Sequence, residues 1–310
     1  MGKYLLYRIG SMFVALFVII TITFFLMHAV PGGPYDFEGQ NLKPEIVELL
    51  QSKYHLNDPL FKQYLDYLKG VVTFDLGPSF YYQGRSVTEV IAQGLPITIR
   101  LSVLSILLVI IVSLPLGIVS ALKRNRLTDR LIMIFATIGR TMPAFVVGTL
   151  LIYFLSYKLR LFPIFGVGTS KHYILPAIAL SLATIAHLTR LIRASMLDVL
   201  NQDYIRTAKA KGLSKTRILL KHALKNASIP MVTVLGSRVA GLLTGSFVIE
   251  QIFAMPGMGR YFTQAISNRD YPMIMGITIY FSLILLVCML VVDILYGLID
   301  PRAAVYGKKR

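Results

Sequence analysis

The stretch from Ile9 to Val30, IGSMFVALFVIITITFFLMHAV, is an unbroken apolar run that decides the fold class. A helix needs about 20 apolar residues, at about 1.5 Å each, to cross a bilayer. The run is longer than the apolar part of a secretory signal peptide, and no small-residue cleavage site precedes Pro31. With Lys3 and Arg8 ahead of it, we interpret it as a first transmembrane helix that the protein retains.

The composition extends this interpretation to the whole chain. Of the 310 residues, 55% are hydrophobic and 15% are charged, whereas a soluble domain carries about 25% charged residues. Internal prolines are acceptable because neighbouring helices can satisfy the backbone groups that they leave unpaired. The sequence therefore predicts an all-α integral membrane protein with six transmembrane helices. The five further spans are expected at about Leu101–Leu122, Leu131–Leu155, Tyr173–Leu191, Ile229–Ile249 and Met273–Ile299.

The net charge of +17 is unevenly distributed along the chain. Basic residues gather at the two termini and in the loops after the second and fourth spans, whereas the opposite loops hold acidic and basic residues in equal number. Cytoplasmic loops of membrane proteins carry the excess of Lys and Arg. We therefore expect a multi-pass protein of the bacterial plasma membrane with both termini in the cytoplasm. The sequence shows no nucleic-acid-binding module, which argues against nucleic acid as the partner.

The long loop at residues 31–95 faces outward in this topology. Its apolar periodicity predicts a short helix over Pro44–Tyr54 and a second one that starts at Asp58 and Pro59, which suit the N-cap and first helical positions. Gly70 is expected to end the second helix. A small extracytoplasmic helical cap follows from this pattern, and a disordered loop is the alternative. The apolar face of the second helix comprises Phe61, Tyr64, Leu65 and Leu68.

A second structured loop is expected on the cytoplasmic side, at residues 192–228. Asp203 is a suitable N-cap for a helix over Tyr204–Lys211, and Gly212 suits the position just after that helix. Ser214 can cap the next helix. A basic, amphipathic helix–Gly–helix segment favours two interpretations: a docking surface for a partner, or an interfacial helix held by anionic lipid. The residues alone leave both open.

The same segment carries a family resemblance. Asp203 to Gly212, DYIRTAKAKG, resembles the coupling-loop motif of ATP-binding-cassette (ABC) importer permeases, in which Glu-Ala-Ala precedes a glycine by three residues. Here Arg206-Thr207-Ala208 occupies the Glu-Ala-Ala position, a departure similar to that of the dipeptide, oligopeptide and nickel permeases. The resemblance implies a contact with a partner ATPase through Asp203, Tyr204, Arg206, Thr207, Ala208, Lys211 and Gly212.

Other stretches resemble the same branch in the same order, over nearly the whole chain. The Gly-Pro-Ser-Phe sequence at residues 77–80 is most similar to the B-type oligopeptide permease subunit. These stretches are Pro31–Pro34, Tyr54–Pro59, Gln63-Tyr64, Asp75–Phe80, Thr244–Glu250, Pro256–Gly259, Asn268–Tyr271, Asp293 and Asp300-Pro301.

The resemblance implies a type I ABC importer-like permease that carries oligopeptides. Its implied partners are a second homologous permease, two cytoplasmic ABC ATPases and an extracytoplasmic peptide-binding protein. The chain has no Gly-x4-Gly-Lys-Ser/Thr loop for phosphates, so ATP and Mg²⁺ are expected on the ATPases. We expect no catalytic residue, cofactor or metal in this chain. The expected organisation is a first helix at 1–30, the cap at 31–95, a permease core at 96–300 that includes the 192–228 loop, and a cytoplasmic tail at 301–310.

Charged residues inside spans are costly and are usually functional. Arg140 and Arg238 are therefore candidates to line the substrate path, where they would meet the carboxyl terminus or backbone of a peptide. The alternative is that they pair with Asp293, Glu250 or the second permease. His187 is expected to be a packed histidine. The outer cap, acidic and aromatic, is the expected seat of the binding protein at Asp58, Tyr64 and Phe80, and a purely structural cap is the alternative.

Other transport classes fit less well. An ion-coupled secondary transporter typically has acids at the bilayer midplane and repeated halves, but only Asp293 is an acid inside an expected span and no repeat is visible. An ion channel or an enzyme lacks supporting motifs. Within the ABC permeases, a nickel or other small-solute permease stays open beside the peptide permease.

Overall fold

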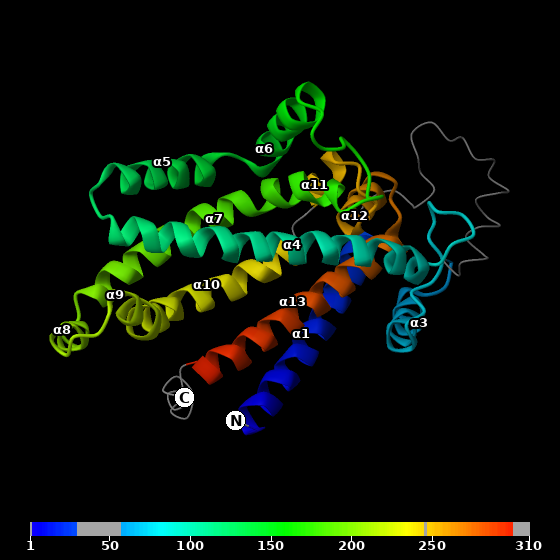
Figure 1. The fold of residues 1–310 in the computed structure, drawn as a ribbon. Coiled ribbons are helices and arrows are strands. Elements are labelled where there is room, and N and C mark those ends of the chain that lie inside the picture. Colours follow the sequence, from blue (N-terminus) through cyan, green and yellow to red (C-terminus); the bar gives the residue numbers. More distant parts are fainter. Residues whose placement is uncertain (1, 30–56, 245–246, 300–310) are drawn as a thin grey trace. The chain divides into compact units, whose positions relative to one another are not determined.

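The computed structural model describes residues 2–29, 57–244 and 247–299, which fold into helices and connecting loops (Figure 1). The chain divides into two compact units. The first, called here the N-terminal unit, contains Gly2–Thr98 and Pro256–Ile284. The second, called the core unit, contains Ile99–Met255 and the chain from Leu285 onward.

The N-terminal unit is built around two helices that touch through aromatic rings. These are α1 (Gly2–Ala29) and α3 (Leu60–Thr73). Tyr64 of α3 is only 9% exposed, and its ring lies 5.3 Å from that of Phe24. Its hydroxyl is 2.7 Å from the hydroxyl of Thr21 on α1. The second cap helix expected from the sequence is therefore present, and Tyr64 attaches it to α1.

Two details expected of this helix are wrong. Pro59 occupies the N-cap position without a side-chain cap, and the carboxylate of Asp58 lies 3.0 Å from the Lys62 amine. Gly70 lies inside the helix, which continues to Thr73. A Cβ on Gly70 would lie 2.4 Å from a backbone carbonyl oxygen, so glycine is needed there for close packing and not for termination. The expected helix over residues 44–54 lies outside the described residues.

The core unit is organised around α7 (Lys171–Leu200), which packs against α5, α6 and α10. Figure 1 shows α7 running between α5 and α10. Buried side chains of α7, including Leu188, Ile192 and Met196, form the apolar centre of this unit. Besides parts of two long helices that also belong to the N-terminal unit, the core unit contains α5 (Leu127–Thr141), α6 (Ala144–Leu151), a π-helical turn (Ile152–Lys158), α8 (Asp203–Ala210), α9 (Lys215–Arg217), a second π-helical turn (Ile218–Ala223), α10 (Leu224–Thr244) and α11 (Phe247–Ile252).

Four described helices are long and apolar enough to cross a membrane on their own. A fifth candidate is the pair Leu127–Thr141 and Ala144–Lys158, which is bent by 106°. The helix α10, where the fifth span is expected, is not among them. Membrane-type helices are therefore established, and the count of six spans stays a prediction. The four single helices are Leu6–Ala29, Val87–Leu122, Lys171–Leu200 and Tyr271–Ile294.

The expectation of one continuous third span over Leu131–Leu155 is wrong, because the helix breaks at Met142-Pro143. Met142 is extended, with φ −75° and ψ 125°, and Pro143 follows with φ −60° and ψ 140°. A proline disfavours helical geometry in the residue before it and has no N–H to donate. The chain therefore turns sharply at this point.

The helix α4 (Val87–Leu122) begins well before the expected second span at Leu101. The Ser86 hydroxyl accepts a hydrogen bond from the Glu89 amide at 3.1 Å, and the Glu89 carboxylate accepts one from the Ser86 amide at 3.2 Å. This reciprocal pair is a capping box, and it fixes the start of α4. The loop that precedes α4 accordingly ends at Ser86. At the other end of the fourth span, α7 runs on to Leu200 instead of ending near Leu191.

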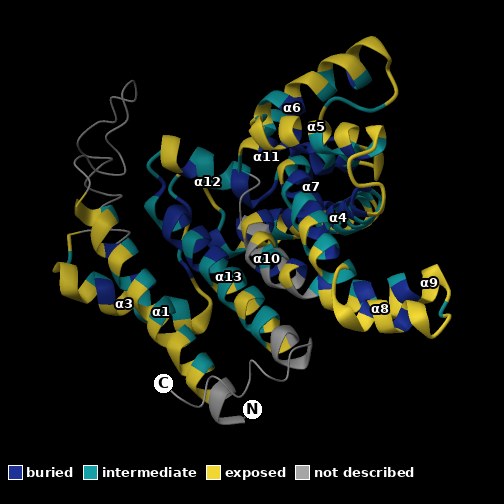
Figure 2. Cartoon of the chain, turned by 90° about the vertical axis from the view of Figure 1, so that its left-hand side faces the viewer, coloured by how far each residue is buried: buried dark blue, intermediate teal, exposed yellow. Residues whose placement is uncertain are grey.

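Figure 2 shows the burial of these elements, with the buried residues gathered on the facing sides of the helices of each unit. The helices α12 (Met258–Ser267) and α13 (Tyr271–Ile299) complete the chain. α13 is continuous from the N-terminal unit into the core unit.

We expect Gly117→Val to destabilise the protein, because a Cβ at Gly117 would lie 2.6 Å from the Cβ of Ile192 on α7. Overpacking of this kind costs about 1–3 kcal/mol. Thermal unfolding of the detergent-solubilised protein should show a melting temperature lower by several degrees. Gly10→Val is the matched control, because nothing lies within 4 Å of a Cβ at Gly10. Equal melting temperatures for the two variants would contradict the described packing of α4 on α7.

Candidate functional site

The α8–α9 segment, residues 203–217, presents one buried face and one exposed face. Ile205 is fully buried and Ala208 is 5% exposed, whereas Tyr204 is 40% exposed. Figure 2 shows both kinds of residue on α8. The buried face joins the apolar centre around α7. The exposed face carries Asp203, Arg206, Thr207, Lys209, Lys211 and Gly212.

The turn after α8 depends on Gly212. Its φ of +75° is in the left-handed region that favours glycine. No atom lies within 4 Å of a Cβ built there, so the constraint is conformational, and the turn projects freely. The Ser214 hydroxyl accepts a hydrogen bond from the Arg217 amide at 3.4 Å and caps the next helix. The expected roles of Gly212 and Ser214 in this turn are confirmed.

The α8–α9 segment is fixed to the helices on either side of it. The Asn226 amide donates a hydrogen bond to the Tyr204 hydroxyl at 2.8 Å, and Ile205 packs with Ile192 and Ile218. The segment is therefore joined to α10 by a hydrogen bond and to α7 through the shared buried cluster.

The expected N-cap at Asp203 is wrong by one residue. Gln202 occupies that position without a side-chain cap, and Asp203 is the first residue of α8. The carboxylate of Asp203 lies 3.6 Å from Arg206 in an exposed pair, which contributes little to stability. Of the seven residues expected at the ATPase contact, Ala208 is the buried one and packs against the core unit.

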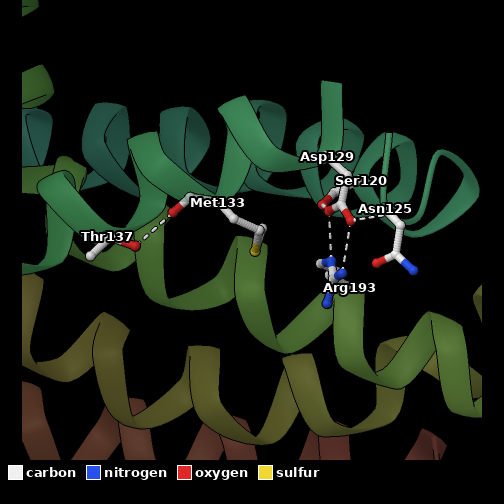
Figure 3. A network of polar contacts seen from close by, with 6 residues as sticks. All are labelled: Ser120, Asn125, Asp129, Met133, Thr137 and Arg193. Atoms are coloured by element: carbon white, nitrogen blue, oxygen red, sulfur yellow. Dashed lines mark hydrogen bonds and ion pairs between the residues drawn. The ribbon is translucent and has the colours of Figure 1, made fainter. Parts of the chain in front are cut away.

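The helix α7, which precedes the α8–α9 segment, also takes part in a buried ion pair. Asp129, 3% exposed, receives Arg193 through two hydrogen bonds, of 2.7 Å from Nε and 2.8 Å from Nη2. The Ser120 hydroxyl donates a hydrogen bond to the same carboxylate, and so does the backbone N–H of Asn125, at 2.9 Å. Figure 3 shows Arg193 reaching Asp129 from the neighbouring helix. The end of α4, the start of α5 and α7 are thereby joined at one point.

Sequence reasoning missed this ion pair, because it treated Asp129 as one of the charges of a short loop. The local signal was the order of residues: Asn125 adopts a left-handed turn with φ +63°, and an acid follows in the first turn of α5. That pattern is typical of an acid whose carboxylate accepts hydrogen bonds from a turn and stabilises the N-terminus of the helix that follows. No feature of the sequence identifies Arg193 as its partner.

In the N-terminal unit, a second buried carboxylate joins two stretches that the sequence analysis had noted separately. Asp270 is fully buried and accepts hydrogen bonds from the Ser79 hydroxyl and from the backbone amides of Phe80 and Tyr81, both at 3.2 Å. It also accepts one from the Met273 amide at 3.3 Å. The loop before α4 is thus fixed to the start of α13.

Tyr82 extends this contact. Its hydroxyl donates to the Gln264 side chain at 2.7 Å, and burial, with the nearby Tyr261, raises the pKa of Tyr82 to about 12. The phenol therefore stays protonated, and remains a donor, at any physiological pH.

The three residues expected to dock the binding protein occupy different environments. Asp58 is partly exposed and pairs with Lys62, whose pKa is raised by that hydrogen bond. Phe80 is half-buried beside the Asp270 contact. Tyr64 is buried against α1 and supports α3 from within.

The two arginines expected inside spans are both exposed on the surface of the core unit. Arg140 lies in the last turn of α5, and Arg238 lies in α10. Neither forms an ion pair with any described residue.

Within residues 2–29, 57–244 and 247–299, no three His, Cys, Asp or Glu side chains are grouped so that they could hold a metal ion.

Known proteins match this chain over nearly its full length. The family model for "Binding-protein-dependent transport system inner membrane component" matches residues 113–305, and the corresponding N-terminal model matches residues 1–102. The dipeptide transport system permease protein DppB of Bacillus subtilis is 45% identical over 99% of this chain and 100% of its own length. The oligopeptide transport system permease protein OppB of Escherichia coli K12 is 40% identical over 97% of this chain and 99% of its own.

A solved structure shows a similar fold. A chain of the MetNI methionine ABC transporter in an inward-facing conformation matches with a TM-score of 0.58 at 15% identity. The match covers 68% of this chain and 96% of that chain.

We expect Asp129→Asn to destabilise the core unit, because it removes the charge that Arg193 binds in a largely buried position. Hydrogen bonds to charged groups contribute about 1.5–3 kcal/mol each to stability, so the melting temperature should fall clearly. Asp203→Asn, which weakens only the exposed 3.6 Å pair, is the control and should change little. Thermal unfolding of both variants checks the prediction, and an unchanged melting temperature in Asp129→Asn would contradict it.

Proposed function

The chain belongs to the family of binding-protein-dependent transport system inner membrane components, and from this premise we propose that it is the permease subunit of an ABC importer that carries oligopeptides. The observation that carries the proposal is the α8–Gly212–α9 segment, an exposed, basic helix–turn–helix fixed to two long helices. The names of the relatives, which are dipeptide and oligopeptide permeases, favour peptides over nickel or another small solute.

We propose that the α8–α9 segment is the handle through which partner ATPases move the membrane helices. In this proposal ATP and Mg²⁺ bind to two cytoplasmic ABC ATPases, and the exposed residues of α8 and the turn insert into a cleft on one of them. Because Ile205 shares a buried cluster with α7 and the Asn226 side chain bonds Tyr204, a push on α8 would reach α10 directly and α7 through this cluster. The contact residues are Asp203, Tyr204, Arg206, Thr207, Lys211 and Gly212, with Ala208 behind them.

The proposed topology has six spans with both termini in the cytoplasm. It divides the chain into a first helix (1–30), an extracytoplasmic region (31–95), a permease core (96–300) and a tail (301–310). A second homologous permease completes the translocation path. Support for this arrangement comes from the charge asymmetry of the loops and from the family membership.

We propose that an external peptide-binding protein docks near Asp58 and Phe80. The two regions that carry these residues are held rigidly, α3 by the Tyr64 contact with α1 and the loop at Phe80 by Asp270. A rigid surface suits docking, because little conformational freedom is lost when a partner binds. Arg140 and Arg238 are proposed to line the path of the released peptide.

We expect Gly212→Val to uncouple ATP hydrolysis from transport, because a β-branched residue disfavours the φ of +75° that shapes the turn. In proteoliposomes with the purified complete complex, uptake of labelled peptide should fall at least tenfold relative to ATP hydrolysed. Gly84→Val is the matched control, since Gly84 has a φ of +76° and equally open surroundings.

Two outcomes would overturn the proposal. Full peptide uptake by Gly212→Val would remove the handle, and a purified complex without a nucleotide-hydrolysing subunit would remove the energy source. Uptake of a nickel chelate in place of labelled peptide would keep the importer and reassign its substrate.

A further inference from the structure

The facing sides of α5 and α7 carry a row of polar contacts. Asp129 of α5 binds Arg193 of α7, and Thr137 of α5 accepts a hydrogen bond from Arg190 of α7. Residue numbers rise along one helix as they fall along the other, so the two helices are antiparallel. One turn beyond Thr137 on α5 is Arg140.

The same register places Arg140 beside His187. One turn before Arg190 on α7 is His187, because residues three apart lie on the same side of a helix. The neighbouring residues agree with this alignment, because a Cβ at Gly139 would lie 3.3 Å from the Cβ of Ala186. The row therefore continues past Thr137 and Arg190 to a third level, where both side chains are basic.

A third helix adds another guanidinium at this level. α10 packs against α7 and carries Arg238. Arg140, Arg190 and Arg238 thus lie on three helices, α5, α7 and α10, near His187. We call these four residues the arginine cluster.

The arginine cluster lies deep within the helices. At about 1.5 Å per residue, Arg140 is roughly 20 Å along α5 from Leu127, and Arg238 is roughly 20 Å along α10 from Leu224. His187 is roughly 20 Å along α7 from Leu200 by the same rise. Because α5 and α10 run opposite to α7, the starts of α5 and α10 lie on the same side of the core unit as the end of α7. In the proposed topology these ends lie on the cytoplasmic side, and a depth of about 20 Å is then within a hydrocarbon core of about 30 Å.

The three guanidinium groups give the cluster a positive charge among the described residues. None of the three arginines forms an ion pair there, and Arg140 and Arg238 are exposed. The Nε atom of Arg190 is buried without a hydrogen-bond partner, while its Nη2 bonds Thr137. An arginine at the centre of a lipid-facing helix costs at least about 2.5 kcal/mol. The cluster must therefore face a polar path or a partner, to which the Nε–H group of Arg190 can still donate a hydrogen bond.

We propose that the arginine cluster binds the terminal carboxylate of the peptide in transit. This inference rests on the proposed function. A guanidinium presents its N–H groups in a planar fork that matches the two oxygens of a carboxylate. Every unmodified linear peptide ends in one carboxylate, whatever its side chains. Three guanidinium groups around one point provide recognition that is independent of the peptide's sequence.

The test uses the complete reconstituted complex and two forms of one labelled peptide, with a free C-terminal carboxylate and with a C-terminal amide. Uptake of both is measured at saturating binding protein for the wild type, Arg140→Gln and Arg238→Gln. The same binding protein serves every variant, so its own preference cancels when ratios of uptake are compared. Arg130→Gln is the matched control, because Arg130 is exposed on α5 but far from the cluster.

We expect the wild type and Arg130→Gln to favour the free-carboxylate peptide, and each cluster variant to reduce that preference about tenfold. The loss of one hydrogen bond to a charged group accounts for a factor of this size. Uptake of the amidated peptide should stay nearly constant across the variants.

Three other outcomes would overturn the inference. An unchanged preference in both cluster variants would show that the arginines do not read the carboxylate. An equal loss of both peptides, with loss of the second permease from the purified complex, would assign the cluster to the interface between permeases. A wild-type complex that takes up neither peptide would instead refute the proposed function itself.

Discussion

The ion pair between Asp129 and Arg193 is the contact on which the core unit depends most. It joins the end of α4 and the start of α5 to α7, at a point where the chain has just turned through a left-handed Asn125. A buried charge pair of this kind stabilises the fold only while every partner is present, because a single charge left behind is costly. Here Ser120 and the Asn125 amide complete the carboxylate's hydrogen bonds. The relative position of α5 and α7 is fixed by that requirement.

This fixed position gives α7 two functional ends in the proposed transport cycle. The α8–α9 segment follows one end of α7 and packs against it through Ile205, while His187 lies about 20 Å away along the same helix. α7 is a continuous helix between these points, even though it contains Pro176 nearer its start. A displacement applied to α8 is therefore carried to the arginine cluster by a rigid element, with no flexible joint between them.

Several features that depend on residues close together in the sequence were predicted correctly. The first span, the turn at Gly212 and the Ser214 cap all follow from residues within a few positions of one another, and the structure has them. The bend at Met142-Pro143 and the start of α4 were missed, although Pro143 and the Ser86–Glu89 capping box carried the information. Apolar periodicity was given more weight than these polar signals. The Asp129–Arg193 and Ser79–Asp270 contacts lie beyond local rules, since their partners are far apart in sequence.

Two arginines of α7, three positions apart in the sequence, differ in the groups that bind them. Arg193 has a carboxylate partner within its own chain, so its charge stabilises the packing of the helices. Arg190 bonds only a neutral hydroxyl, and it lies at the level where Arg140 and Arg238 bring two more positive charges. Folding alone would favour removing such repulsion or adding an acid. Three guanidinium groups at that depth are therefore best explained by an anion that is not part of the folded chain.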